Sequence, residues 1–299
     1  MDGIILIDKP AGITSHDVVN RLRHALGIKR VGHTGTLDPF ATGLLVMLVG
    51  QATRLARYLD MDEKEYEALV QFGSETDTGD ATGRQIAECG LRNTDLAARV
   101  ASIDWVDTFS QFQGEIMQVP PMYSAKKVEG KKLYELARQG KDIERKPVQV
   151  TIRELELLEH DQPSPSSRRI RVVCSAGTYI RTVAEDIGRA AGLGAHLTEL
   201  RRTRAGRFHI SNTITLEELD SATDRSRFVV PMSEAAGHLP FFQLNDDRVA
   251  KTRSGLSSRT NGEFEAGRPV RMLDPQGNLI AIGEFDAVEK TVQPKVVFG

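Results

Sequence analysis

The sequence has few cysteines, few aromatic residues and no long apolar segment. Its 299 residues include two cysteines, Cys89 and Cys174, and neither belongs to a Cys-x-x-Cys pair, so neither a disulfide framework nor a zinc site is indicated. The longest apolar run, residues 44–49, is far shorter than the roughly 20 residues that a membrane-spanning helix needs. With 40% apolar, 27% charged and 6% aromatic residues, the composition indicates a globular protein and excludes collagen-like, coiled-coil and disordered chains.

The sequence also lacks a secretory signal pattern and a general excess of basic charge. Asp2 stands where a signal peptide has basic residues, and the apolar stretch at residues 4–7 is short, so we expect a cytoplasmic protein without a membrane anchor. The formal net charge is −2. Basic residues nevertheless concentrate in segments 18–31, 124–146 and 201–207. Such segments are more often solvated faces than nucleic-acid sites, so composition alone leaves RNA binding open.

Apolar periodicity predicts strands and helices along the first 240 residues. Strands are expected at 3–7, 44–49, 66–72, 148–152 and 170–174, and helices at 15–26, at 51–59, from Thr94 and from Thr178, which we expect to cap its helix. Beyond residue 240 the pattern changes to a helix that starts at Asn245 and to short strands around a turn at 274–277. This change predicts two domains, residues 1–239 and residues 240–299.

The most unusual segment is a glycine-rich loop at residues 32–43 that leads into an apolar strand. It matches neither the phosphate-binding P-loop nor the dinucleotide-binding fingerprint. Asp38 precedes Pro39 in this loop, and an isolated Asp-Pro pair is more often only the start of a turn. The loop alone therefore does not define a site.

The loop at 32–43 resembles the catalytic loop of the TruB-type tRNA pseudouridine-55 synthases. Further segments resemble that family in the same order along the chain: Asp8-Lys9-Pro10, Lys64-Glu65-Tyr66, 76–80, 120–126, 177–181 and Leu200-Arg201-Arg202. The resemblance covers most of residues 3–210. The segment after residue 240 resembles, more weakly, the small RNA-binding PUA domain.

This resemblance implies a fold, an activity and a partner. The implied fold is α+β, the pseudouridine synthase fold with a mixed, largely antiparallel sheet flanked by helices, followed by a small C-terminal β-rich PUA-like domain. The implied activity is isomerisation of uridine 55 to pseudouridine in the T-loop of tRNA, with the base flipped out of the stack and no metal or organic cofactor. The tRNA T-arm is the expected partner, and we expect a monomer without an obligatory protein partner. The alternatives are a pseudouridine synthase for another RNA, and a tRNA-binding protein without catalysis.

The resemblance also implies roles for individual residues. Asp38 is the catalytic aspartate, Tyr66 stacks on the target base, Arg181 is the ion-pair partner of Asp38, and Leu200 belongs to the apolar pocket wall. Taken singly, Tyr66 and Leu200 are more often core residues. An arginine in the first turn of a helix, as expected for Arg181, opposes the helix dipole unless an anion lies nearby.

Three further residues carry weaker assignments. His33 is implied to lie near the flipped base, although a lone histidine is usually a surface or core residue. Lys9 either binds a phosphate or supports the pocket. Asp80 either belongs to the site or caps the turn at 76–80.

The basic arm, residues 120–146, is expected to clamp the RNA stem, because phosphate contacts position an RNA while loop contacts specify it. The RNA-binding residues predicted from the basic segments are Lys126, Lys127, Lys131, Lys132, Arg201 and Arg202.

Overall fold

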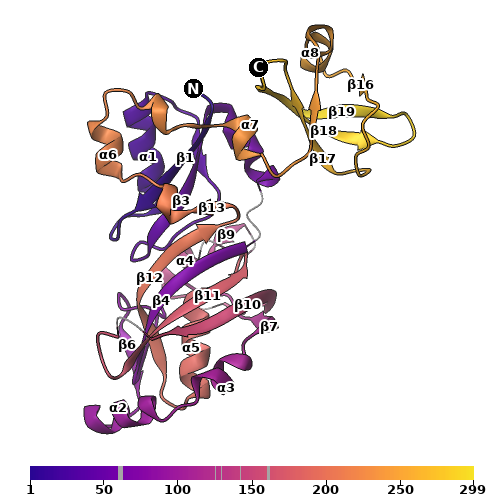
Figure 1. Cartoon of the computed structure of the whole chain (residues 1–299). Coiled ribbons are helices and arrows are strands. Elements are labelled where there is room, and N and C mark those ends of the chain that lie inside the picture. The colour runs from indigo at the N-terminus through magenta and orange to yellow at the C-terminus, as the bar shows by residue number, and fades with distance from the viewer. Residues whose placement is uncertain (60–62, 125, 129, 142, 160–161) are drawn as a thin grey trace.

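The computed structural model describes residues 1–59, 63–124, 126–128, 130–141, 143–159 and 162–299. A central sheet runs through residues 1–239 in the order β14-β1-β3-β12-β4-β11-β10-β7, with β13 paired to β12 and β2 to β3 (Figure 1). Its strands are β1 Gly3–Lys9, β2 Val31–His33, β3 Thr42–Val49, β4 Glu63–Phe72, β7 Gly114–Gln118, β10 Val148–Leu158, β11 Ser167–Ser175, β12 Ala195–Ala205, β13 Phe208–His209 and β14 Val230–Pro231. Among these pairs only β12 with β3 is parallel within the described residues, which confirms a mixed, largely antiparallel sheet.

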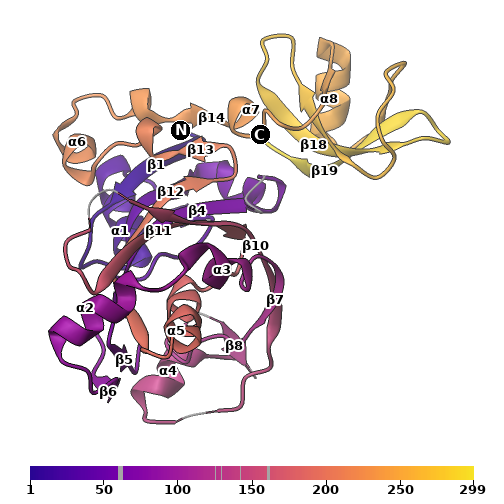
Figure 2. The same ribbon diagram turned by 60° about the horizontal axis from the view of Figure 1, so that its bottom comes forward.

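Helices cover one face of this sheet and form the main core with it, as Figures 1 and 2 show. They are α1 Ser15–Leu26, α2 Asn93–Ala101, α3 Trp105–Ser110, α5 Ile180–Ala190 and α6 Leu216–Ser221. α1 begins as predicted, because Thr14 and Asp17 form a capping box, and it ends at Gly27 in the left-handed conformation. The buried stripe of α5 packs on β12, so the helix that carries Arg181 is fixed to the middle of the sheet.

Three local predictions were wrong or incomplete. The helix predicted at 51–59 is present, and the sequence did not specify that it is a 3₁₀ helix, η1 Gly50–Tyr58. Thr178 does not cap α5: Tyr179 holds the cap position without a side-chain bond, while the Thr178 hydroxyl donates to the carbonyl of Ser175 at 2.9 Å. Strand β12 was not predicted, because its three arginines conceal the apolar alternation that places it between β3 and β4.

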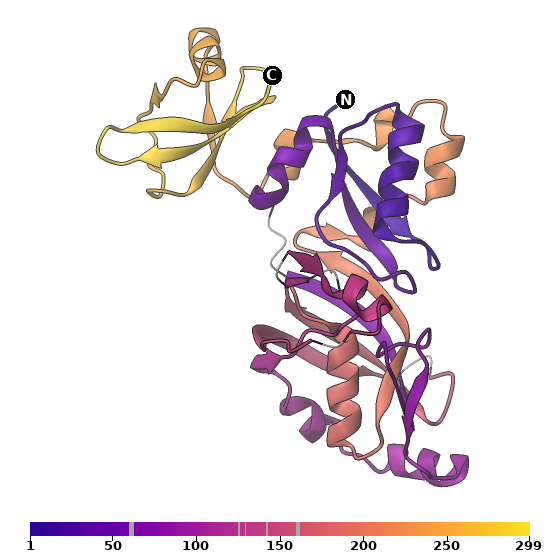
Figure 3. The same cartoon turned by 180° about the vertical axis from the view of Figure 1, so that it is seen from behind.

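The chain after residue 240 builds a second sheet in the order β15-β17-β18-β19-β16. Its elements are β15 Phe241–Gln243, α8 Asp246–Arg253, β16 Ser258–Arg259, β17 Pro269–Leu273, β18 Leu279–Asp286 and β19 Thr291–Val297. The helix capped by Asn245 and the turn at 274–277 agree with the sequence. This sheet has a core of its own, residues 242–297, and lies beside η1 and the N-terminal strands (Figure 3). Phe298 joins the apolar cluster under β1 and β3, and Arg54 lies over its ring.

Smaller elements complete the fold. The hairpin β5 Ser74–Thr76 with β6 Gln85–Glu88 lies off the central sheet, and α7 Met232–Ala235 follows β14. The basic arm contains β8 Lys127–Val128, β9 Lys131–Lys132 and α4 Leu133–Arg138. The side chains of Lys127, Lys131 and Lys132 lie outside the described part of the chain. No helix in the described ranges is both long enough and apolar enough to span a bilayer.

Candidate active site

The loop between β2 and β3 carries Asp38 and is anchored by its neighbours. The Ser15 hydroxyl, at the start of α1, donates to the carbonyl of Leu37 at 3.1 Å and accepts from its amide at 2.9 Å. The amide of Gly12 donates to the carbonyl of Pro39 at 2.8 Å. Both residues that flank Asp38 are therefore tied to the β1–α1 connection, which fixes the direction of the Asp38 side chain.

Lys9 is a buried support of this loop. Its side chain is completely inaccessible, and its ammonium donates to the carbonyls of Pro10 at 2.8 Å, Ile13 at 2.8 Å and Pro39 at 3.3 Å. Burial lowers the pKa of Lys9 to about 8. Of the two roles left open by the sequence, this geometry favours support of the pocket, because all three contacts are to backbone and none of the ammonium faces solvent.

Gly43 allows β3 to lie directly against β12. It has a φ of +101°, and a Cβ atom at this position would lie 2.3 Å from the carbonyl oxygen of Arg202. A side chain is therefore excluded both by the backbone conformation and by the close approach of β12. The end of the Asp38 loop thus meets the strand that carries Leu200.

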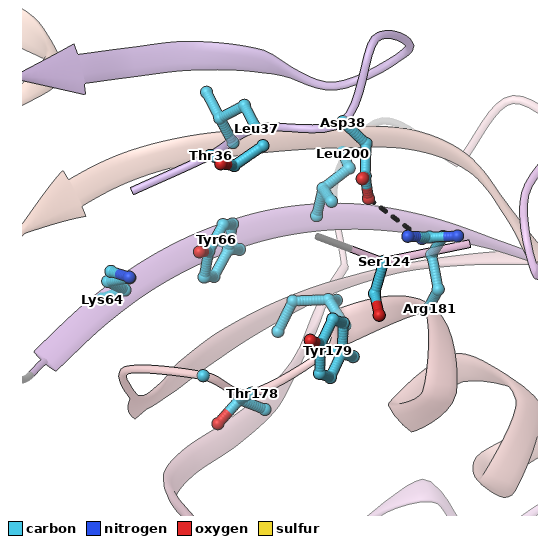
Figure 4. A pocket seen from close by; sticks show the side chains of 12 residues that line it. Thr36, Leu37, Asp38, Lys64, Tyr66, Ser124, Thr178, Tyr179, Arg181 and Leu200 are labelled. Atoms are coloured by element: carbon cyan, nitrogen blue, oxygen red, sulfur yellow. Dashed lines mark ion pairs between the residues drawn. The ribbon is translucent and has the colours of Figure 1, made fainter. Parts of the chain in front are cut away.

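Asp38 forms an ion pair with Arg181 from the first turn of α5. The Nε atom of Arg181 lies 2.9 Å from Oδ2 of Asp38 (Figure 4). The Arg181 side chain is 4% exposed and that of Asp38 is 33% exposed, so the carboxylate faces open space while its partner is enclosed. An arginine in the first turn of a helix needs a nearby anion, and Asp38 is that anion for Arg181.

The remaining nitrogens of the Arg181 guanidinium are also occupied. Nη1 donates to the carbonyl of Thr78 at 2.7 Å, and Nη2 donates to the carbonyl of Tyr123 at 2.8 Å. Oδ2 of Asp80 lies 3.7 Å from Nη1. An arginine with all of its nitrogens engaged is held in one orientation, so Arg181 presents Nε to Asp38.

Asp80 contacts both its own turn and Arg181. Its Oδ1 accepts from the hydroxyl of Thr78 at 3.0 Å and from the amide of Thr82 at 2.9 Å, so it caps the turn at 76–80. Its second oxygen faces Arg181. Because Asp80 is 4% exposed, this turn adds a buried negative charge beside the guanidinium.

The surroundings of Asp38 act on its pKa in opposite directions. Burial raises the pKa of the carboxyl above its usual value, the nearby charge of Asp80 adds to this rise, and Arg181 opposes it. The net direction is upward. Asp38 is thus a carboxylate that is less well solvated than in water but still paired with a cation, which suits a group that must be ionised and reactive.

A cavity of about 220 Å³ lies next to the Asp38–Arg181 pair, and Figure 4 shows its lining. Tyr66 from β4 presents its ring to the cavity, and Leu200 from β12 lies between the ring and Asp38. Burial raises the pKa of the Tyr66 phenol, so the ring stays neutral. The lining residues are Thr36, Leu37, Asp38, Lys64, Tyr66, Ser124, Gly177, Thr178, Tyr179, Ile180, Arg181 and Leu200. An aromatic face, apolar walls and one paired carboxylate can enclose a planar ring and act on one of its edges.

Gln118 at the end of β7 fixes the wall of this cavity that residues 177–180 form. Its side-chain amide donates to the carbonyl of Tyr179 at 3.0 Å and accepts from the amide of the same residue at 2.8 Å. Gln118 is 1% exposed. This two-point bond holds residues 177–180 against the sheet directly before Arg181.

The structure brings four of the predicted site residues together in the cavity lining: Asp38, Tyr66, Arg181 and Leu200. His33, Lys9, Asp80, Arg201 and Arg202 lie outside the lining. His33 accepts from the amide of Gly35 through Nδ1 at 3.2 Å, and burial lowers its pKa. It therefore shapes the start of the Asp38 loop.

Arg201 and Arg202 do not form one RNA-binding patch, because their side chains lie on opposite faces of β12. Arg202 is 2% exposed and donates to the carbonyls of Leu44 at 2.7 Å and Gly35 at 3.2 Å, so it braces the Asp38 loop and is too buried to meet a phosphate. Arg201 points to the other face of β12, where its Nη2 lies 2.6 Å from Oδ2 of Asp8. The sequence analysis grouped the two arginines in one patch because it did not recognise strand β12. Successive residues of a strand face opposite sides of the sheet, so the two side chains are separated.

Sequence reasoning missed the lining residues Leu37, Ser124, Thr178 and Tyr179 as individuals. All of them lie within segments that the sequence had singled out, 32–43, 120–126 and 177–181. The resemblance of these segments thus indicated where the cavity lies, but the residue types did not indicate which side chains line it. Among the described residues, no three His, Cys, Asp or Glu side chains gather as a metal site would require.

The fold is shared with solved structures. A structure of a Cbf5-Nop10-Gar1 complex matches with a TM-score of 0.70 at 27% identity, covering 99% of this chain and 85% of that chain. A structure of an H/ACA RNP bound to a substrate RNA containing 2'-deoxyuridine matches with the same TM-score, identity and coverage.

Sequence comparisons assign the family. A family described as TruB family pseudouridylate synthase (N terminal domain) matches residues 23–180, and one described as tRNA pseudouridylate synthase B C-terminal domain matches residues 181–235. A protein named tRNA pseudouridine synthase B from Heliobacterium modesticaldum is 40% identical, covering 100% of this chain and 96% of its own. One of the same name from Aromatoleum aromaticum is 47% identical, covering 99% and 92%.

Fold and comparisons define the chain as a pseudouridylate synthase, an isomerase. It belongs to the TruB family.

Proposed function

We propose that this chain converts uridine 55 of the tRNA T-loop to pseudouridine, with the target base turned out of the stack and Asp38 as its catalytic group. The observation that carries the proposal is the Asp38–Arg181 ion pair of 2.9 Å beside a cavity that contains the ring of Tyr66. The tRNA substrate is supported by the names of the relatives that match nearly the whole chain.

The reaction needs the groups that the cavity offers. The N1–C1′ bond of uridine breaks, the uracil turns over, and C5 bonds to C1′. The proton on C5 leaves and N1 gains one, so the product is an isomer of the substrate. A base inside a duplex or a stacked loop cannot turn in this way, so it has to enter a closed pocket. Stacking on Tyr66 between apolar walls holds the ring, and the ionised Asp38 acts on the sugar or on the ring.

The rest of the chain is suited to grip the RNA. We infer that the basic arm, which includes Lys126, contacts the RNA stem, and that residues 240–299 form a PUA-like RNA-binding domain next to residues 1–239. Support for this division comes from the separate core of the second sheet, which begins at Phe242. These contacts would position the tRNA while the cavity acts on the base.

The test uses loss of the C5 proton. A tRNA transcript made with uridine tritiated at C5 is incubated with the protein, and tritium release into water is measured. We expect release of one equivalent per tRNA from wild-type protein, and none from a transcript in which cytidine replaces uridine 55. Carbodiimide adducts mapped by reverse transcription then locate the product. Release that persists from the cytidine transcript would show another target position, and no release from any tRNA would exclude the proposed activity.

A further inference from the structure

Ser124 lines the cavity and carries a buried polar group without an assigned task. It lies at the root of the basic arm, 4% exposed, and its hydroxyl has no hydrogen-bond partner among the described residues. Buried hydroxyls are nearly always bonded, and one left without a partner costs free energy. An unpartnered hydroxyl in the wall of a binding cavity therefore indicates a partner that arrives with the ligand.

Several other hydrogen-bonding groups near Ser124 are already engaged. The Thr178 hydroxyl donates to the carbonyl of Ser175 at 2.9 Å. Both backbone groups of Tyr179 are bonded to Gln118. The carbonyl of Tyr123 accepts from Arg181. Among the described residues of this lining, Ser124 thus carries the buried hydroxyl that is left without a partner.

The position of Ser124 is fixed from both sides. The preceding residue, Tyr123, is bonded to Arg181 at 2.8 Å, and the carbonyl of Ser124 itself accepts from the amide of Tyr134 in α4 at 3.1 Å. Figure 4 shows Ser124 beside Arg181 and Tyr179, across the cavity from the Asp38 loop. A serine hydroxyl can reach three staggered positions by rotation about χ1, so it can turn to a ligand without movement of this backbone.

We propose that Ser124 binds the polar edge of the flipped uracil, through a hydrogen bond with its carbonyl oxygen or its N3–H group. The inference rests on the proposed function, because it requires a uracil in this cavity. A hydroxyl both donates and accepts, so it can follow either edge group as the ring turns over. The bond would link the base to the root of the arm that we expect to grip the RNA.

The experiment measures binding rather than turnover. All proteins carry Asp38→Asn, so that the base is not converted, and each is titrated with two tRNAs, one with uridine at the target position and one with an abasic analogue there. Ser124→Ala is expected to weaken binding of the uridine tRNA by about 2- to 13-fold, the range for loss of one hydrogen bond. It should leave binding of the abasic tRNA unchanged, because no base is present to contact Ser124.

Ser167 provides the control. It is also a buried serine, 1% exposed, but it lies at the start of β11, outside the cavity lining, and its hydroxyl donates to the carbonyl of Ser164 at 3.0 Å. Ser167→Ala should leave the affinity for both tRNAs unchanged, because Ser167 is too far from the cavity lining to contact the base. If circular dichroism shows that Ser124→Ala is unfolded, Ser124→Cys, which keeps the shape but is a weak donor, gives the same comparison.

Equal losses on both tRNAs would assign Ser124 a structural role and overturn the proposal, and so would the absence of any loss. Tritium release by the protein with its natural Asp38 is measured in parallel. A failure of the Ser124 comparison in a protein that releases tritium refutes only this inference, whereas absence of release refutes the proposed function itself.

Discussion

The two faces of the central sheet use arginine–carboxylate pairs for different purposes. On the cavity face, Arg181 is 4% exposed and lies 2.9 Å from Asp38. On the opposite face, Arg171 is 27% exposed and lies 2.9 Å from Glu65, 2.6 Å from Glu154 and 3.1 Å from Glu156. The distances are alike, but the surroundings are not.

The difference shows that burial and redundancy, rather than distance, decide what an ion pair is worth. Loss of one carboxylate around Arg171 leaves two others and nearby water to solvate the guanidinium, so little free energy is lost. Loss of Arg181 leaves Asp38 and the buried Asp80 without their cation, which is costly. The outer pairs lie on the partly exposed face of β4, β10 and β11, and the inner pair sets the chemistry of the cavity.

The largest expected effect on activity comes from Asp38→Asn. The amide keeps the size of the side chain but removes the charge, so we expect tritium release to fall by at least about 10³-fold while tRNA affinity stays within a few fold. Because burial raises the pKa of Asp38, its ionised form is disfavoured in the folded protein, and the variant should be no less stable at pH 7.

The control for this variant is Asp220→Asn. Asp220 is also paired with an arginine, Arg21, but its side chain is 40% exposed on the surface. This variant should keep full activity. Turnover by Asp38→Asn at more than a hundredth of the wild-type rate, after deamidation is excluded by mass spectrometry, would remove Asp38 from the reaction.

Arg181→Met tests the burial side of the comparison. We expect the free energy of unfolding to fall by about 3–5 kcal/mol, because Asp38 and Asp80 lose their shared cation and the carbonyls of Thr78 and Tyr123 lose a donor. Urea unfolding followed by circular dichroism measures this change. A loss below about 1 kcal/mol would mean that Arg181 is no more important to stability than a surface arginine.

The pH dependence tests the charge of the inner pair. Since the pKa of Asp38 is raised, the ionised form is present above that pKa and is lost as the pH falls through it. Single-turnover tritium release should therefore fall tenfold per pH unit on the acid side, with a midpoint above the ordinary aspartate value of 3.8.

Arg181→Lys extends the same measurement. A lysine cannot offer the fixed set of donors that arginine provides, so it opposes the effect of burial less well. The acid limb of the rate profile should move to higher pH in this variant. A midpoint below 3.8 in the wild-type protein, or a shift to lower pH in the variant, would contradict the balance of burial and pairing inferred for Asp38.

Sequence predicted elements with clean apolar periodicity and missed the central strand β12, where charge interrupts the pattern. Strand β3 and helix α1 follow from their apolar pattern and caps. β12 is central, but Arg201 and Arg202 made it look like a surface patch. One of these arginines is in fact buried against the Asp38 loop and the other is on the outer face. A strand whose neighbours supply carbonyls and carboxylates can hold arginines that no periodicity rule expects.

The site shows the same limit. The resemblance located Asp38, Tyr66, Arg181 and Leu200, all of which line the cavity. It did not locate Gln118, which acts through backbone contacts to Tyr179. Residues that bond to backbone leave no pattern in a single sequence, because what they contact is set by the fold and not by residue type.

The smallest expected effect comes from Glu154→Gln on the outer face. Glu154 makes the shortest of the three Arg171 contacts, at 2.6 Å, so a rule based on distance would predict the largest loss. Its side chain is 47% exposed, and Arg171 keeps Glu65 and Glu156 as partners. We therefore expect the free energy of unfolding to fall by about 1 kcal/mol or less, and the loss to shrink at high salt as the charges are screened. Urea unfolding of the variant and of wild type at low and high salt measures both quantities, with Arg181→Met as the buried reference. A loss of about 3 kcal/mol or more that does not respond to salt would place the outer pairs in the same class as the inner one, and the contrast between the two faces would then have no energetic basis.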